Sequence, residues 1–200
     1  MTTSKTDAET IAVYDAKAQD YLDTFTSNKP SRQLQAFIDA LPTGGTALDI
    51  GCGPGNSAAA MRDAGLTVTA IDPSQEMARV GQERFGITIQ IGTFDDITQT
   101  DHFDGIWASF SMLHVPRPDV PRHLAAIHQA LKPGGLFFIG VKTGTGARRD
   151  GIGRKYTYFE VDELKTLLAD AGFTLATLQT GTEKGLDGTM ADFVMMTAHA

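Results

Sequence analysis

From residue 46 onward, short apolar segments alternate with amphipathic segments, and glycines mark many of the boundaries between them. Each apolar segment has the length of a β-strand, and each amphipathic segment has the period of a helix. The expected strands cover residues 46–50, 66–71, 87–91, 103–110, 136–141, 173–180 and 193–198, and the expected helices cover residues 56–64, 74–85, 119–131 and 162–171. Such an alternation predicts an α/β fold, in which helices cover both faces of a parallel sheet.

Two helices are expected before the first strand. Residues 8–26 carry their apolar side chains on roughly one face, and residues 31–41 repeat theirs at helical spacing. The sequence Asn28-Lys29-Pro30 separates the two helices. No internal repeat or low-complexity tract interrupts the pattern, so we expect a single domain over residues 1–200.

Composition and charge exclude several classes of protein. The chain is 42% hydrophobic and 20% charged, which is typical of a globular domain. A net charge of −7 leaves no global basic surface, so no nucleic-acid partner is expected. The single cysteine, Cys52, excludes a disulfide framework within the chain and a multi-cysteine metal site, and no metal is expected. Residues 1–10 lack an apolar signal segment and no apolar run is long enough for a membrane span, so we expect a cytoplasmic protein without a membrane partner.

A glycine-rich loop follows the first expected strand and opens a helix; residues 49–55 read DIGCGPG. Glycines in such a loop permit positive φ and let a ligand approach the backbone closely. Asp72 ends the next strand, 17 residues after Gly55. A carboxylate in that place accepts hydrogen bonds from the hydroxyls of a ribose, so the pair predicts a cofactor that contains adenosine.

The loop has four other interpretations, and the sequence argues against the first two. The dinucleotide fingerprint G-x-G-x-x-G of a nicotinamide-dependent oxidoreductase would place its third glycine at Asn56, whereas the glycine here is Gly55. The phosphate loop of nucleotide hydrolases ends in Gly-Lys-Ser or Gly-Lys-Thr, and no such ending follows Gly55. A plain tight turn, or a protein that binds a cofactor without catalysis, would also fit the glycines.

The segment at residues 47–55 reads ALDIGCGPG and closely resembles motif I of the class I S-adenosylmethionine-dependent methyltransferases. Four later segments are similar to the family's next motifs, in order: TAIDPSQEM at 69–77, IGTFDDI at 91–97, FDGIWASFSMLHVP at 103–116 and ALKPGGLFFIG at 130–140. The chain resembles the small single-domain members of types 11 and 25. The resemblance implies a Rossmann-like, doubly wound seven-stranded sheet in the order 3-2-1-4-5-7-6 with strand seven antiparallel. It also implies a core over residues 43–200, a helical lid over residues 1–42, and a methyltransferase whose cofactor is S-adenosyl-L-methionine.

The resemblance implies a set of cofactor-binding residues: Tyr14, Asp49, Gly51, Gly53, Asp72, Pro73, Met77, Thr93, Phe94 and Ser109. The backbone of Gly51 and Gly53 would meet the methionine arm, and Asp72 the ribose. Many relatives carry an aspartate where Thr93 stands, and a hydroxyl accepts a weaker hydrogen bond than a carboxylate. Asp95 and Asp96 are both candidates to replace it.

No catalytic dyad is identified by the sequence. The sulfonium of the cofactor is a very good leaving group, so the protein mainly has to align the acceptor and exclude water. A base is needed only if the acceptor enters protonated. His114 follows the fourth strand and is either that base or a packing residue.

The acceptor is predicted to be a small molecule, and one segment suggests that it carries an anionic group. Residues 142–155 hold five basic side chains and one acidic side chain, and their glycines predict a flexible loop over the carboxyl ends of the strands. Arg148 and Arg149 would hold the anion, with Tyr156 or Tyr158 beside it. Solvent-facing charge is the alternative.

Overall fold

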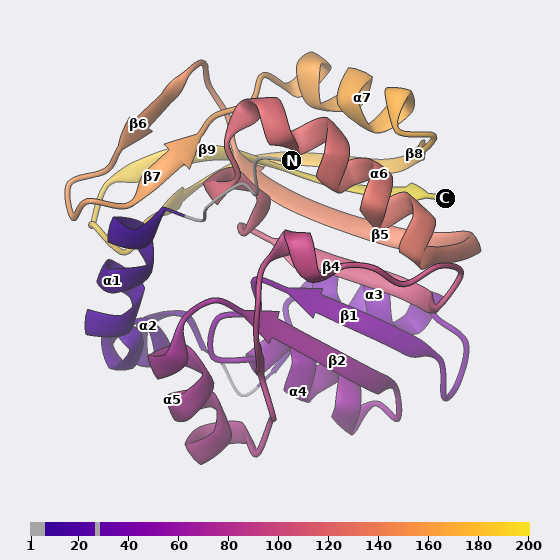
Figure 1. Ribbon diagram of the computed structural model, residues 1–200, viewed down its shortest axis with the longest axis horizontal. Helices are drawn as coiled ribbons and strands as arrows, with labels where there is room; N and C mark the ends of the chain where they lie inside the picture. Colours follow the sequence, from indigo (N-terminus) through magenta and orange to yellow (C-terminus); the bar gives the residue numbers. More distant parts are fainter. Residues whose placement is uncertain (1–6, 27–28) are drawn as a thin grey trace.

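A seven-stranded sheet forms the centre of the computed structural model, which describes residues 7–26 and 29–200 (Figure 1). Its strands are β1 (Thr46–Ile50), β2 (Thr67–Asp72), β3 (Gln90–Ile91), β4 (Phe103–Ser109), β5 (Leu131–Lys142), β8 (Thr174–Lys184) and β9 (Met190–His199). The order is β3-β2-β1-β4-β5-β9-β8, and β9 is antiparallel to both of its neighbours. Since β6 and β7 belong to a separate ribbon, the expected order 3-2-1-4-5-7-6 with an antiparallel last strand is confirmed.

The helices are α1 (Ala8–Ala16), α2 (Ala18–Phe25), α3 (Arg32–Ala40), α4 (Asn56–Asp63), α5 (Gln75–Phe85), α6 (Val120–Ala130) and α7 (Val161–Asp170). Short 3-10 turns lie at η1 (Phe94–Asp96), η2 (Met112–His114) and η3 (Arg117–Asp119). Within the described ranges, no helix combines the length and the apolar character that a membrane span requires.

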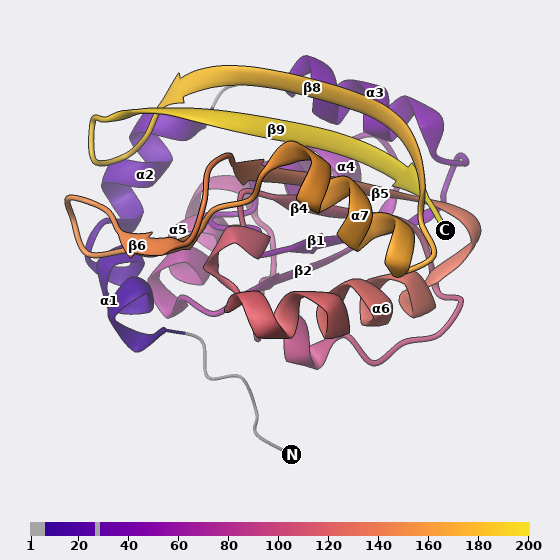
Figure 2. The same cartoon turned by 90° about the horizontal axis from the view of Figure 1, so that it is seen from above.

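Helices cover both faces of the sheet because side chains alternate across each strand. Trp107 of β4 packs against residues of α3 and α4, whereas its neighbour Ile106 packs against residues of α6 and α7. Figure 2 shows α3 on one side of the central strands and α6 on the other. Both faces of the central strands are therefore buried, as their apolar sequences predict.

Local signals in the sequence set the bounds of α5 to within one residue. The Oγ of Ser74 accepts a hydrogen bond from the backbone N–H of Met77 at 3.0 Å and caps the helix start. Gly86 ends the helix with a left-handed φ of +63°. Only Pro73 and Ser74 separate Asp72, the last residue of β2, from the start of α5.

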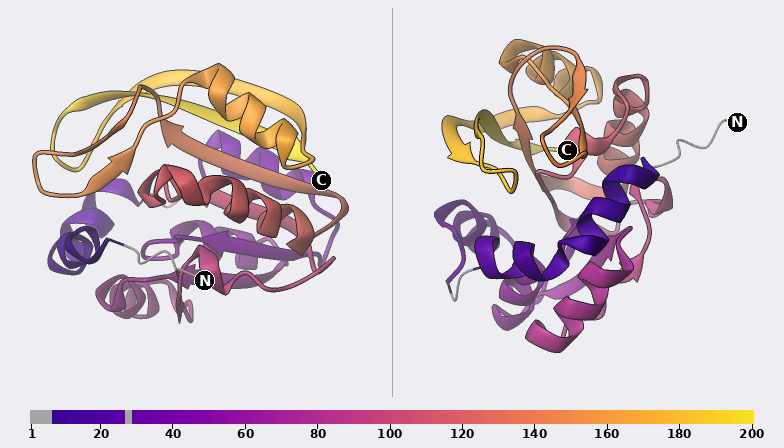
Figure 3. Two further views of the ribbon diagram at one scale, coloured as in Figure 1. Left: turned by 45° about the horizontal axis from the view of Figure 1, so that its top comes forward. Right: turned by 90° about the vertical axis from the view of Figure 1, so that its left-hand side faces the viewer.

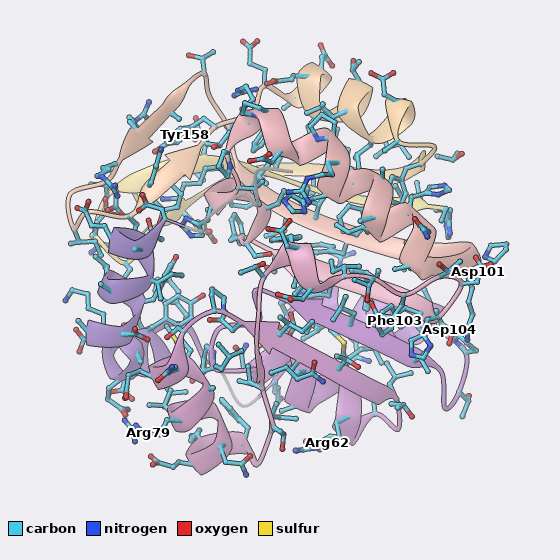
Figure 4. The ribbon with its side chains drawn as sticks, in the orientation of Figure 1. Arg62, Arg79, Asp101, Phe103, Asp104 and Tyr158 are labelled. Carbon is cyan, nitrogen blue, oxygen red and sulfur yellow. The ribbon has the colours of Figure 1, made fainter. Side chains whose placement is uncertain are left out.

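Polar contacts also fix the end of the sheet that lies away from the carboxyl ends of the parallel strands. Asp104 accepts hydrogen bonds from Thr46 N at 2.8 Å and from Lys132 Nζ at 2.8 Å, which ties the amino ends of β1, β4 and β5 together. Figure 4 shows Phe103 and Asp104 at this end and Tyr158 at the other. The loops at the carboxyl ends are thus left to form a site.

The N-terminal helical segment differs from the prediction of one helix over residues 8–26. The backbone turns at Lys17, where φ is −117° and ψ is 18°, and so separates α1 from α2. The turn lets Ala18 and Leu22 of α2 pack against Val80 of α5 while α1 continues toward β6 and β7. Figure 3 shows both helices crossing the end of the sheet. Of the predicted break Asn28-Lys29-Pro30, residue 28 lies outside the described residues.

The basic segment predicted to be a flexible loop is instead ordered into a two-stranded ribbon, β6 (Ala147–Arg149) and β7 (Lys155–Thr157). Its turn is closed by Asp150, whose carboxylate accepts hydrogen bonds from the backbone N–H groups of Ile152 and Arg154. An aspartate that binds the backbone two residues further on is a turn-forming signal that outweighs the surrounding glycines. The prediction of an irregular loop was therefore wrong at Ala147–Arg149 and Lys155, which pair as strands.

Candidate functional site

The loop after β1 has a backbone conformation that favours glycine. Gly51, Gly53 and Gly55 have φ of +65°, +56° and +78°. A Cβ on Gly51 would lie 2.3 Å from the Cβ of Ser111, whose Oγ donates a hydrogen bond to Ile50 O at 2.7 Å. Without side chains here, backbone groups of the loop can face a ligand directly.

Asp72 connects this loop to β2. One carboxylate oxygen accepts a hydrogen bond from Gly53 N at 2.8 Å, and the other accepts one from Ser74 N at 2.9 Å. Burial raises the pKa of Asp72 to about 7, although these two backbone donors oppose the rise. The carboxylate is therefore fixed in direction at the edge of the site, with remaining lone pairs for a hydroxyl donor.

Asp49 at the end of β1 is the second buried carboxylate of the site. Its Oδ2 is buried and makes no hydrogen bond to any described residue. Burial raises the pKa of Asp49 to about 8; the backbone N–H of Ala58 opposes the rise and the charge of Asp72 adds to it. A buried polar atom without a partner is uncommon and suits a ligand that brings a donor.

Two cavities open at the carboxyl ends of the strands. The smaller has a volume of about 100 Å³, and its walls include every predicted cofactor residue except Asp49. The larger has a volume of about 820 Å³ and includes Asp49. Tyr14, Tyr21, Gly51, Ser109 and Phe110 line both cavities, so the two adjoin at the end of β4.

The far wall of the smaller cavity is formed by η1. Thr93 and Phe94 both line it, but the Thr93 hydroxyl accepts a hydrogen bond from Asp95 N at 3.2 Å and so caps the turn. Asp96 accepts from Thr93 N at 2.7 Å and completes the cap. Of the two aspartates, Asp95 lines the cavity, and its carboxylate pairs with Arg122 at 2.5 Å.

His114 is a half-buried residue that lines the smaller cavity and belongs to a chain of hydrogen bonds. Its Nδ1 lies 2.8 Å from the carbonyl oxygen of Lys155, which can only accept, so Nδ1 carries the proton. The other nitrogen, Nε2, therefore accepts from the Tyr14 hydroxyl at 2.9 Å. Arg154 in turn donates to the Tyr14 oxygen at 3.3 Å. Burial lowers the pKa of His114 to about 4, so the ring is neutral at pH 7.

Helix α1 is attached to both sides of the site. On the ribbon side, Arg149 pairs with Asp7 at 2.9 Å, and Lys155 N donates to the Thr10 hydroxyl at 2.8 Å. On the α5 side, the Ser74 hydroxyl donates to Asp15 at 2.6 Å. These contacts hold α1 across the cavities.

The residues predicted to bind the acceptor separate into two groups. Tyr156 lines the larger cavity, whereas Arg148, Arg149 and Tyr158 line neither cavity. Arg149 is engaged with α1, and the guanidinium of Arg148 lies 4.0 Å from the centre of the Tyr158 ring. Arg148 and Arg149 therefore contribute to neither cavity.

Sequence reasoning did not single out Lys142 and Arg154, which are two of the basic residues that line the larger cavity. Both belong to the basic segment. Because that segment was predicted to be a loop, the direction of these two side chains could not be predicted. The signal was the alternation along β5: Lys142 lies two residues after Gly140, so a longer strand puts it on the face that bears Trp107 and Ser109.

A family model described as a methyltransferase domain matches residues 22–178, which is most of the chain. The chain is a class I S-adenosylmethionine-dependent methyltransferase. It is 27% identical over 151 residues to an uncharacterized methyltransferase of Staphylococcus carnosus, covering 68% of this chain and 73% of the relative. It is 30% identical over 148 residues to a ubiquinone biosynthesis O-methyltransferase of Pseudomonas syringae, covering 68% of this chain but 63% of that relative.

Solved methyltransferase structures share the fold. The 1,6-didemethyltoxoflavin-N1-methyltransferase of Burkholderia thailandensis, solved with 1,6-didemethyltoxoflavin and S-adenosylhomocysteine bound, is 28% identical to this chain. The match has a TM-score of 0.73 and covers 94% of this chain and 87% of that one. Its bound product agrees with the cofactor predicted here, S-adenosylmethionine.

The residues of this methyltransferase suit that cofactor. The methionine arm carries an ammonium and a carboxylate, and the unpartnered Oδ2 of buried Asp49 is an acceptor for a donor of that kind. The open backbone at Gly51 and Gly53 leaves room beside it. The loop has neither the lysine of a phosphate loop nor the third glycine of a dinucleotide loop.

Proposed function

We propose that this methyltransferase transfers the methyl group of S-adenosylmethionine to a small molecule held in the larger cavity. The observation that carries the proposal is the junction of the two cavities at Ser109 and Phe110. The smaller cavity contains the predicted adenosine residues, and the larger one has volume for an acceptor on the other side of that junction. An acceptor held there lies beside the cofactor site, where it can be aligned with the methyl group.

Several residues would hold the cofactor. Asp72 accepts from the ribose, Pro73 and Met77 give apolar contact to the adenosine, and Asp95 or Thr93 accepts from the adenine. The bound sulfonium supplies an activated methyl group. The chain's own residues align the acceptor with it and exclude water.

The relatives do not indicate which kind of atom on the acceptor is methylated. They include an enzyme named for N1-methylation, several named for O-methylation and one named as a C-methyltransferase of ubiquinone and menaquinone biosynthesis. That last relative, from Rubrivivax gelatinosus, matches over 36% of its own length. The proposal is therefore limited to a small acceptor that fits the larger cavity.

Tyr14 and His114 would accept a proton from the acceptor if the acceptor binds in its protonated form. The lone pair of His114 Nε2 is occupied by the Tyr14 hydroxyl. An acceptor proton would reach His114 by passing to the Tyr14 oxygen while Tyr14 passes its own proton to Nε2. In the absence of such a proton, His114 acts as a positioning residue that orients Tyr14 at the cavity wall.

We also propose that α1 and α2 form a lid. Both tyrosines of this segment, Tyr14 and Tyr21, line both cavities, so the segment closes over the sites that it covers. Its exposed ion pairs with the ribbon contribute little to stability, which allows it to open.

The proposal is tested by measuring cofactor binding and then methyl transfer. S-adenosylhomocysteine should bind the wild-type protein in titration calorimetry, and Asp72→Ala should weaken that binding by about 1.5–3 kcal/mol, the contribution of a charged hydrogen bond. Asp39→Ala, an exposed position on α3, is the control and should bind normally. Incubation with methyl-labelled S-adenosylmethionine and a fractionated extract should then label a small-molecule fraction. Labelling of macromolecules alone would overturn the small acceptor, and equal binding by Asp72→Ala would overturn the ribose assignment.

A further inference from the structure

Lys142, the last residue of β5, is a buried cation that faces the larger cavity. Its relative exposure is 7%. Among the described residues, its Nζ has no hydrogen-bond or ion-pair partner, and its contact is the ring of Tyr156, whose centre lies 4.3 Å away. A nearly buried lysine without a counter-ion is costly, so the cavity holds an unsatisfied positive charge.

The charged groups around Lys142 do not neutralise it. Arg154 is already paired with Asp150 at 2.7 Å. The carboxylate of Asp187 accepts hydrogen bonds from Thr189. Glu183 lines the cavity but makes no ion pair with Lys142. Burial and the neighbouring Arg154 lower the pKa of Lys142, as expected for an ammonium that lacks a partner, while Asp187, Asp150 and Glu183 oppose the shift.

The strand register places the backbone of Lys142 relative to the junction of the two cavities. Gly140 is paired with Ser109, which lines both cavities. Lys142 lies on the same face two residues further along, which is about 6.5 Å in a strand. The side chain of Lys142 lines the same larger cavity as Ser109, and its Nζ lies 3.3 Å from the position that a Cβ on Gly185 would occupy.

We propose that Lys142 recognises a carboxylate or a similar monoanionic group on the methyl acceptor. The inference rests on the proposed assignment of the larger cavity to the acceptor. Lys142 offers one ammonium to one negative charge, because Arg154 beside it is paired with Asp150; Lys29, Arg84 and Lys184 also line the cavity. The group binds at Lys142, on strand β5, and not at Arg148 or Arg149, whose side chains are engaged outside the cavities.

The experiment compares benzoate with benzamide, two probes of equal shape that differ in charge. Both are titrated into the protein saturated with S-adenosylhomocysteine, and affinities are read from nuclear magnetic resonance shifts. The wild type should prefer benzoate by about tenfold, the size of one charge-assisted hydrogen bond. Lys142→Met should abolish the preference, and Lys142→Arg should retain part of it. Arg148→Met, which removes a cation of the ribbon, is the matched control and should bind as the wild type does.

The outcomes separate this inference from the proposed function. Equal affinity for the two probes, absence of saturable benzoate binding, or an unchanged preference in Lys142→Met would overturn the role of Lys142. Loss of the preference in Arg148→Met alone would assign the anion to the ribbon instead. Binding of S-adenosylhomocysteine is measured first for each variant. Its failure in the wild type would count against the proposed function, whereas normal binding without an anion preference overturns only this inference.

Discussion

At the scale of single residues, Gly51 gives a prediction with a matched control. Gly51→Ala adds the strain of a positive φ and a contact with Ser111 that the backbone must relieve. Gly44→Ala adds the same φ strain in open space, since nothing lies within 4 Å. Urea unfolding should show a loss of about 1–2 kcal/mol for Gly44→Ala and of about 3 kcal/mol or more for Gly51→Ala. Equal losses would mean that Ser111 gives way freely.

The buried carboxylates predict how stability depends on pH in the absence of ligand. The pKa of Asp49 is about 8 in the folded protein and about 3.9 in the unfolded chain, so the folded state binds the proton more tightly. Its contribution to stability is full below pH 3.9 and is lost as the pH rises through 8. Asp72, with a pKa of about 7, acts in the same direction.

The useful window is pH 6.5 to 8, because His114 opposes this trend at lower pH. Its pKa is about 4 when folded, so stability from that group rises with pH up to its unfolded value of about 6.5. Between pH 6.5 and 8 the free energy of unfolding should fall in the wild type. Asp49→Asn should lose roughly 2 kcal/mol less than the wild type by pH 8. The free energy of unfolding is measured by urea titration at each pH. If it falls equally in the two proteins, the pKa of Asp49 is not raised in the folded state.

At the scale of elements, α1 and α2 carry the prediction about the lid. If the segment closes over bound ligand, S-adenosylhomocysteine should slow amide hydrogen exchange in α1 and α2. The same measurement on β1 and β5 gives the control, since these central strands are protected by the sheet in either state. Asp15→Ala removes the bond to Ser74 and should speed exchange in α1. Identical exchange with and without ligand would identify a permanently docked helix.

The sequence could predict elements whose signals are local. Ser74 and Gly86 define α5, and the apolar run before Gly51 defines β1, so both were found almost to the residue. The break at Lys17 has no glycine or proline to mark it, because the cause is packing of Leu22 against α5, a tertiary contact. The ribbon was missed for a related reason, since its glycines indicated flexibility while the closing contacts of Asp150 depend on the folded turn.

The candidate site likewise has one part that local sequence signals predict and one part that depends on tertiary contacts. Most of the predicted cofactor residues lie at or just after the carboxyl ends of β1, β2, β3 and β4, and the order of these strands brings them together, so a motif is enough to predict that they gather. The lining of the larger cavity depends instead on which side chains of β5 and β7 point inward. Lys142 lies inside and Arg149 outside, although both belong to one basic segment. That difference follows from strand length and pairing, which the motif does not encode.

At the scale of the whole molecule, the smaller cavity joins distant parts of the chain. Its walls come from α1, from the loop after β1, from β2 and η1 and from α6, where His123 lies. A ligand that fills it should therefore stabilise these segments together and raise the temperature of a single unfolding transition. The stabilisation from a ligand at one hundred times its dissociation constant is about 2.7 kcal/mol.

For a domain of this size, that free energy should raise the melting temperature by roughly 5–10 °C with S-adenosylhomocysteine. NAD at the same concentration should give no rise, because the loop lacks the third glycine at the position that the dinucleotide pattern requires. The measurement is differential scanning calorimetry with each ligand, with Asp72→Ala as a variant in which the rise should be smaller. A shift with NAD and none with S-adenosylhomocysteine would assign the cavity to a nicotinamide cofactor instead. A rise with S-adenosylhomocysteine confined to a partial transition would show that the lid and the core unfold separately.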